Sequence, residues 1–189
     1  MTDQPDQQRE LLNRSICSEL ERTIDARIDR YLSVNHQWLI ANHHFAHASH
    51  ECLLLYRDGY FTSCIMVAQA LSEGILMFVA KRNNVQQVEK KTKQVLAKKM
   101  QQDGILSQAF VEAFGRIQRS FRNDFHHMNL PVATVPLEAL AKRLIADLAT
   151  LEREVFEYSI GAGGTLLPKN LKYWDMQPDG SVPVYVRGY

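Results

Sequence analysis

The run Arg-Asn-Asp-Phe-His-His at residues 122–127 holds side chains suited to phosphodiester chemistry. The guanidinium of Arg122 stays charged and can bind two phosphate oxygens at once. An imidazole titrates near neutral pH, so His126 or His127 can take up or release a proton. His126 is four residues from Arg122 and shares its helix face, whereas His127 is about 140° round the helix. The alternative is that these residues have only a structural role. They would then form the solvent-exposed face of a helix, with a terminal histidine that interacts favourably with the helix dipole.

Further basic side chains surround this run in the sequence. On one continuous helix Arg116, Arg119 and Asn123 lie on the polar side, opposite a phenylalanine stripe, and we expect both arginines to bind substrate. Residues 81–99 carry a local charge of +6, from seven basic residues and one acid. Such a segment fits either an anionic partner or a solvated helix face. Its candidate phosphate-binding residues are Lys90, Lys91 and Lys93.

Glu73 is a candidate supporting acid. It lies in the most apolar part of the chain, one helical turn after Gln69. A buried carboxylate needs a partner, and an arginine of the 122–127 run is one candidate. A purely structural ion pair or an exposed edge is the alternative.

A second histidine group lies at residues 36–50. On a continuous helix His36, His43, His47 and His50 would lie within about 60° of each other. His43 and His47 have a spacing that lets two imidazoles share a metal, with His50 as a third ligand. The segment has no His-Glu-x-x-His pattern. A polar helix face is therefore the preferred interpretation, and we expect neither a metal nor another cofactor.

The composition is that of a globular protein. The chain has 189 residues, a formal net charge of +1 and 46% hydrophobic residues, which suits one domain with a substantial core. Its cysteines (Cys17, Cys52 and Cys64) form no Cys-x-x-Cys pair, and we expect buried thiols in a reducing compartment. The longest apolar run, 64–80, is interrupted by polar residues. We therefore expect a cytoplasmic protein without a membrane span.

Helical periodicity extends from residue 7 to residue 160. It predicts helices over 7–33, 35–57, 60–81, 84–102, 106–128 and 136–160. The helix over 60–81 is apolar nearly all round and should be central. The first helix has a stripe that we assign to the core, made of Ile16, Leu20, Ile24, Ile28 and Tyr31.

A different pattern follows residue 160. The segment 161–164 is glycine-rich and predicts a flexible linker. Residues 173–186 predict a hairpin about the turn at 178–181, which should dock on the helical body or on a second subunit because a lone hairpin is marginal. We therefore expect an all-α bundle of five to six helices over 1–160, and a linker with a docking hairpin over 161–189.

Arg122, Asn123 and His127 together resemble the motif of the HEPN superfamily, in which four to six residues separate an arginine from a histidine late in a helical bundle. The family often has a polar residue after the arginine, as at Asn123. The segment from Tyr56 to Glu73 resembles the family's earlier region, and the resemblance covers about residues 35–160. Arg30 with His36 and Arg119 with His126 also fit the loose spacing.

The resemblance implies an antiparallel helical bundle that acts as a metal-independent endoribonuclease, often a toxin or a defence protein. Two copies of the motif face each other across a homodimer. Arg122 would bind the scissile phosphate, His127 would act as acid or base, and Asn123 would orient the site. RNA would be the substrate, and an antitoxin or a regulatory protein a further partner. Other members have lost catalysis and bind nucleotides or proteins, which is the alternative function for this chain.

Overall fold

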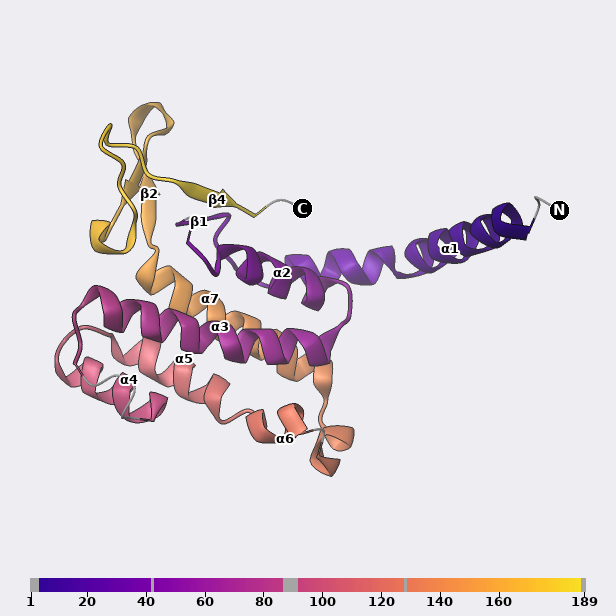
Figure 1. The fold of residues 1–189 in the computed structure, drawn as a ribbon, viewed down its shortest axis with the longest axis horizontal. Coiled ribbons are helices and arrows are strands. Elements are labelled where there is room, and N and C mark those ends of the chain that lie inside the picture. Colours follow the sequence, from indigo (N-terminus) through magenta and orange to yellow (C-terminus); the bar gives the residue numbers. More distant parts are fainter. Residues whose placement is uncertain (1–3, 42, 87–91, 128, 188–189) are drawn as a thin grey trace.

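The computed structural model describes residues 4–41, 43–86, 92–127 and 129–187. The chain is mostly helical, as predicted (Figure 1). Its α-helices are α1 (Gln4–Leu32), α2 (Ala46–Arg57), α3 (Phe61–Arg82), α4 (Lys93–Gln102), α5 (Gln108–Gln118), α6 (Arg122–His127) and α7 (Leu137–Val155). Its short strands are β1 (Leu39–Ala41), β2 (Tyr158–Ile160), β3 (Leu166–Pro168) and β4 (Val184–Val186).

Helix α3 is the centre of the body, as its apolar sequence predicts. It packs against α2, α5 and α7, and α7 also packs against α5. Ile65, Ala68, Ile75 and Leu76 of α3 are fully buried. By length and composition alone α3 would also pass as a membrane span, but most of it is buried inside the protein, and core helices pass the same test.

Four predicted helices differ from those observed. The helix predicted over 84–102 is observed only as α4 from Lys93, because residues 83–86 are not helical and 87–91 lie outside the described residues. The helix predicted over 35–57 starts only at Ala46, because residues 39–41 form a strand. The helix predicted over 106–128 is broken into α5 and α6, and the one predicted over 136–160 ends at Val155. Each difference arises where strand pairing or a local turn outweighs helical periodicity.

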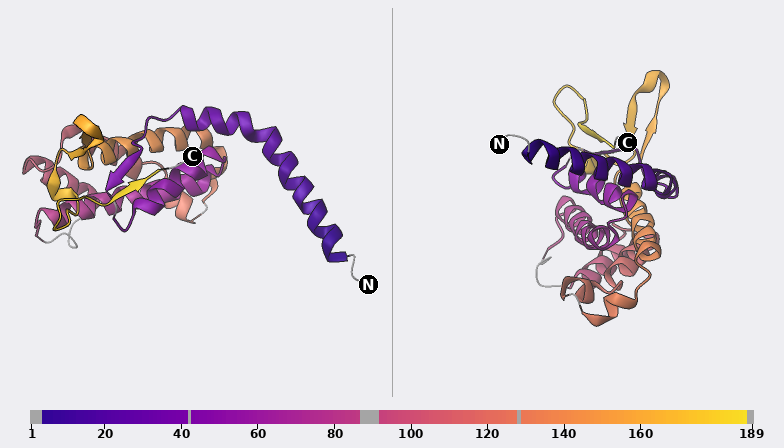
Figure 2. Two further views of the ribbon diagram at one scale, coloured as in Figure 1. Left: turned by 90° about the horizontal axis from the view of Figure 1, so that it is seen from above. Right: turned by 90° about the vertical axis from the view of Figure 1, so that its right-hand side faces the viewer.

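Helix α1 is the element that departs most from expectation. It extends away from the body, and only its last turns contact the rest of the chain (Figure 2). Arg30 of α1 donates a hydrogen bond of 2.8 Å from Nε to the carbonyl of Arg57. Tyr31 is buried as predicted, but the rest of the apolar stripe is exposed, and so is Cys17. Cys52 and Cys64 are buried, as expected, as free thiols.

The strands form two small sheets rather than the predicted hairpin over 173–186. Antiparallel β2 and β3 make a hairpin, and its turn is the segment 161–164 that the sequence predicted as a linker. Gly163 and Gly164 have φ of +76° and +81° there, which only glycine adopts readily. Strand β4 pairs instead with β1, Ile40 opposite Tyr185. The last described residues therefore lie along the start of α2 (Figure 1).

A buried ion pair fixes the end of the chain. Arg187 donates to the carboxylate of Glu152 on α7, with Nη2 and Oε2 2.6 Å apart. Ser49 of α2 hydrogen-bonds to both side chains, and the backbone N–H of Arg187 donates to the carbonyl of Trp38 at 2.9 Å. The tail is thereby joined to β1, α2 and α7.

Candidate active site at the corner between α5 and α6

A sharp corner separates α5 from α6. Phe121 has φ of +54°, a left-handed conformation that costs a non-glycine residue roughly 1–2 kcal/mol. The preceding residue, Ser120, is held by Gln69 of α3, whose side-chain amide donates to its carbonyl at 3.0 Å. Gln69 is fully buried. The core thus enforces the corner, and the corner sets the direction of α6 and of its first residue, Arg122.

Glu73 and Arg122 form an ion pair across this corner. The Glu73 Oε1 and Arg122 Nη2 atoms are 3.0 Å apart, and the two side chains are 20% and 42% exposed. The same Glu73 oxygen has no aligned hydrogen-bond donor, so the contact is a close ion pair rather than a directed hydrogen bond. Arg122 is therefore positioned by Glu73 but keeps much of its guanidinium open to solvent.

A groove of about 420 Å³ opens beside Arg122. Lys93, Arg119 and Arg122 line it together with Asn123, and Asp124 is the one acid among the lining residues that the structure describes. The groove also includes Thr92, which caps α4 by accepting from the Val95 N–H. The N-terminus of a helix carries partial positive charge. Three cationic side chains and a helix N-terminus therefore converge on one open groove.

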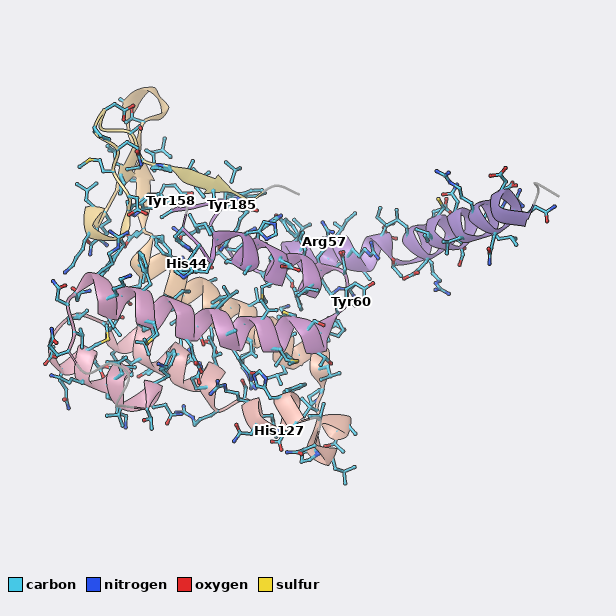
Figure 3. The ribbon with its side chains drawn as sticks, viewed as in Figure 1. His44, Arg57, Tyr60, His127, Tyr158 and Tyr185 are labelled. Atoms are coloured by element: carbon cyan, nitrogen blue, oxygen red, sulfur yellow. The ribbon has the colours of Figure 1, made fainter. Side chains whose placement is uncertain are left out.

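The two histidines of the motif lie in the last turn of α6. His127 projects at the lower end of the molecule, beyond the corner (Figure 3). Both His126 and His127 are exposed. Within the described part of the chain, no hydrogen bond or ion pair joins either imidazole to Arg122. Both rings are free to meet a ligand or another protein chain.

The other predicted substrate-binding residues have different placements. Arg116 makes a two-pronged contact with Asp147 of α7, at 2.7 Å and 3.0 Å to Oδ1, so it lies away from the groove. Lys93 lines the groove, and its Nζ lies 3.1 Å from the sulfur of Met77. Lys90 and Lys91 lie outside the described residues.

The second histidine group does not share one helix face. His43 lies before α2 and stacks on Phe156 with ring centroids 4.7 Å apart. His47 and His50 lie on α2 beside Tyr185 of β4, and His36 precedes β1. Across the ranges that the structure describes, no three His, Cys, Asp or Glu side chains gather as metal ligands.

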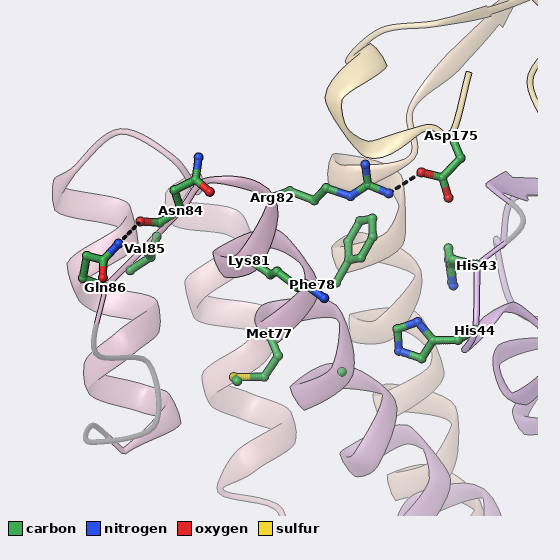
Figure 4. Close-up of a pocket in the computed structure, with 11 residues that line it drawn as sticks. His43, His44, Met77, Phe78, Lys81, Arg82, Asn84, Val85, Gln86 and Asp175 are labelled. Atoms are coloured by element: carbon green, nitrogen blue, oxygen red, sulfur yellow. Dashed lines mark hydrogen bonds and ion pairs between the residues drawn. The ribbon is translucent and has the colours of Figure 1, made fainter. Parts of the chain in front are cut away.

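Burial dominates the electrostatics of His43. Loss of solvent and, secondarily, the neighbouring His44 lower the pKa of His43 from 6.5 to about 3. The imidazole therefore stays neutral in the folded protein. It borders a cavity of about 980 Å³ between α3 and the tail, where Arg82 pairs with Asp175 (Figure 4).

Two features of the site were missed by sequence reasoning. Thr92 was placed inside a helix over 84–102, although a threonine before a helical run is a common N-cap signal. The sequence around the corner at Phe121 has no glycine or proline that would predict a break in the helix. Comparison of the chain with protein-family models, with curated proteins and with solved structures finds no match.

Proposed function

We propose that this chain is a metal-independent endoribonuclease with a HEPN-type bundle. Arg122 binds the scissile phosphate, and His127 acts as general acid or base. The observation that carries the proposal is the open groove in which Arg122, Arg119 and Lys93 converge at the α4 N-terminus. A phosphodiester offers this groove the negative charge that it lacks, and the guanidinium fork matches phosphate oxygens.

The Arg122–Glu73 pair suits a role in binding and cleavage. Catalysis by positioned charge requires a cation that is already oriented when negative charge develops. Glu73 orients Arg122 at 3.0 Å without enclosing it. Asn123 lies next along α6 and lines the same groove. It can hydrogen-bond to ribose or phosphate.

The reaction needs a general base and a general acid in addition to binding. A base removes the proton of the ribose 2′-hydroxyl, and the 2′-oxygen attacks phosphorus. The bond to the 5′-oxygen breaks, and an acid protonates that leaving oxygen, which gives a 2′,3′-cyclic phosphate and a 5′-hydroxyl. A second copy of the chain supplies a second histidine, so that one imidazole acts as base and the other as acid. The exposed position of His127 on α6 is compatible with such a composite site.

The matched variants His127→Ala and His126→Ala test this assignment. Both residues are exposed on α6, so both variants should fold. We expect His127→Ala to slow cleavage about 10²–10⁴-fold in the presence of a chelator, and His126→Ala to have a much smaller effect. The reverse result would assign the proton transfer to His126. Equal rates for wild type and both variants would overturn the proposal.

The second candidate function is a binding module of the same fold. It is favoured by the separation of Arg122 from both histidines, since no hydrogen bond or ion pair joins them in the described part of the chain. This function predicts RNA or nucleotide binding that depends on Arg122, with no product carrying a 2′,3′-cyclic phosphate. End-group analysis of incubated RNA therefore distinguishes the two functions.

A further inference from the structure

Helix α1 presents an uncovered apolar surface. Its 29 residues span about 43 Å, and most of this length lies clear of the body (Figure 2). The exposed large aliphatic residues are between 42% and 73% exposed, and they are Leu11, Leu12, Ile16, Leu20, Ile24, Ile28 and Leu32. The helices of the body bury side chains of the same types. A contiguous exposed apolar surface of this kind marks an interaction site.

The base of α1 also provides a receptor for apolar side chains. A groove of about 450 Å³ runs along the helix where it joins the body. Apolar side chains and two arginines line it, and they are Leu20, Ile24, Ile28, Tyr31, Leu32, Arg27 and Arg57. The groove is therefore an apolar slot of side-chain size. The free half of the same helix carries Leu12 and Ile16, side chains of the kind that it accepts.

The spacing of the stripe is self-complementary. Leu12, Ile16, Leu20, Ile24 and Ile28 follow at intervals of four, with Leu20 in the middle. If a second α1 runs antiparallel about Leu20, Leu20 meets its own copy and Ile16 meets Ile24. Leu12 and Ile28 lie about 80° to either side of Leu20 and flank this contact. Rows of residues at intervals of four interdigitate when two helices cross at about −50°.

The charges on α1 are compatible with a second copy as the occupant. The helix has five arginines and six acidic residues, a net charge of only −1. Two copies therefore do not repel strongly, and each offers both signs to the other. A strongly basic or acidic partner would find no matching excess of charge on this surface.

We propose that α1 joins two copies of this chain into an antiparallel dimer centred on Leu20. The Ile16 side chain of each copy packs against the groove formed by Leu20, Ile24 and Ile28 of the other. This arrangement covers the middle of the exposed stripe. It also explains why a helix with so few contacts to its own body is formed, because helices gain most of their stability from packing of an apolar face.

The α1 contact leaves the candidate active site open. Helices α1 and α6 lie on opposite sides of α3 in the views of Figures 1 and 2. The α1 contact is therefore a different interface from the one that the proposed composite active site needs, and the two interfaces do not exclude each other. A His127 variant that loses cleavage should still form the α1 contact. The α1 contact is measured without RNA, so its failure and the failure of the proposed function can be told apart.

Disulfide crosslinking of the full chain tests the orientation. The exposed Cys17 is first replaced by Ser, and Cys52 and Cys64 are buried. Leu20→Cys should then crosslink to itself under mild oxidation. Ile16→Cys alone should crosslink at least tenfold more slowly than an equimolar mixture of Ile16→Cys with Ile24→Cys. A parallel pair would reverse that order and overturn the proposal, as would failure of Leu20→Cys to crosslink.

Light scattering tests the contact without a disulfide. The wild-type chain should have at least twice the monomer mass of 21.7 kDa, and Leu20→Glu should raise the dissociation constant of the α1 contact at least tenfold. Ser18→Glu is the matched control, because Ser18 is exposed and lies about 160° round the helix from Leu20. A monomeric wild type at tens of micromolar, or equal effects of the two variants, would contradict the proposal.

Discussion

Two Arg–Glu pairs in this protein have the same chemistry in opposite surroundings. Arg187 and Glu152 join the tail to α7, and their side chains are only 2% and 3% exposed. Arg122 and Glu73 join α6 to α3, and their side chains are 42% and 20% exposed. The first pair is enclosed by further hydrogen bonds, because Ser49 donates to Glu152 and Arg187 donates to Ser49 and to the Gln37 carbonyl. The second pair opens onto a cationic groove.

The difference separates a structural role from a binding role. A buried charge pair has exchanged its water for protein partners, so it has no capacity left for a ligand and becomes costly to break. A half-exposed pair contributes little to stability because water and salt screen it. Its arginine can still bind an incoming phosphate. The surroundings, rather than the residue types, therefore favour a binding role for Arg122 and a structural role for Arg187.

The largest expected effect is on stability at the buried pair. Arg187→Ala leaves the Glu152 carboxylate buried without its counter-charge, and we expect the free energy of unfolding to fall by about 3–5 kcal/mol. Urea denaturation measures this loss. Lys169→Ala is the control, since it breaks the exposed Lys169–Glu157 pair in the same part of the fold and should cost less than about 1 kcal/mol.

A combined replacement sharpens that comparison. Changing Arg187 to Met, Glu152 to Leu and Ser49 to Ala removes all the charge of the buried cluster while roughly keeping its volume. Buried ion pairs replaced in this way often leave stability unchanged or increase it. The triple variant should therefore be more stable than Arg187→Ala. Equal losses of stability in the triple variant and in Arg187→Ala would contradict this expectation. They would show that the Arg187–Glu152 contact itself, rather than the absence of an unpaired charge, stabilises the tail.

A smaller effect is expected from acid. The folded protein keeps His43 neutral until about pH 3, whereas the unfolded chain protonates it near pH 6.5. The stability that comes from keeping His43 neutral is fully present above pH 6.5. It is lost as the pH falls toward 3, because the unfolded chain binds a proton that the folded protein does not. The loss reaches at most about 1.4 kcal/mol per pH unit. Denaturation between pH 7 and pH 4 should show a shallower decline for His43→Leu than for wild type, and parallel curves would contradict this cause.

Glu73→Gln should distinguish the contribution of the exposed pair to stability from its effect on RNA binding. We expect a stability change below about 1 kcal/mol. Removal of the carboxylate that pairs with Arg122 should tighten RNA binding about fivefold at low salt, the equivalent of about 1 kcal/mol. Fluorescence anisotropy with a short RNA measures the affinity. Glu10→Gln, which breaks an exposed Arg–Glu pair on α1, should leave RNA affinity unchanged.

The smallest expected effect concerns Lys93. Phosphate contacts release counterions, so each one adds about one to the slope of log affinity against log salt. Lys93→Ala should therefore lower that slope by about 1. Lys99→Ala is the control, because Lys99 pairs with Asp103 at the other end of α4. Identical slopes for wild type and Lys93→Ala would show that Lys93 makes no phosphate contact.

The sequence predicted the elements whose burial is periodic. Helices α3 and α7 lie close to their predicted ranges because their apolar residues recur at helical spacing and are buried. The periodicity of α1 was equally clear, but it could not show that most of the stripe faces solvent. The β1–β4 pairing joins residues almost 150 positions apart. No local pattern encodes such a pairing.

The same limit applies to the candidate site. Arg122, Asn123 and Arg119 were found from residue type, and all three line the groove. Angles counted along one continuous helix failed at Phe121, because the hydrogen bond from Gln69 to Ser120 that holds the corner comes from α3. The same count grouped Arg116 with these residues, although Arg116 pairs with Asp147 of α7. Contacts between helices, which a helical wheel omits, decided both outcomes.

The central claim is that the Arg122 guanidinium acts on a phosphodiester. Its most direct test is the rate of RNA cleavage by Arg122→Lys in the presence of a chelator, measured beside wild type with the unfolding midpoints of both. Lysine keeps the charge but lacks the planar fork. We predict unchanged stability, a rate about 10²–10³-fold lower, and products of the wild type that end in 2′,3′-cyclic phosphate. Cleavage by the variant at the wild-type rate would contradict the claim.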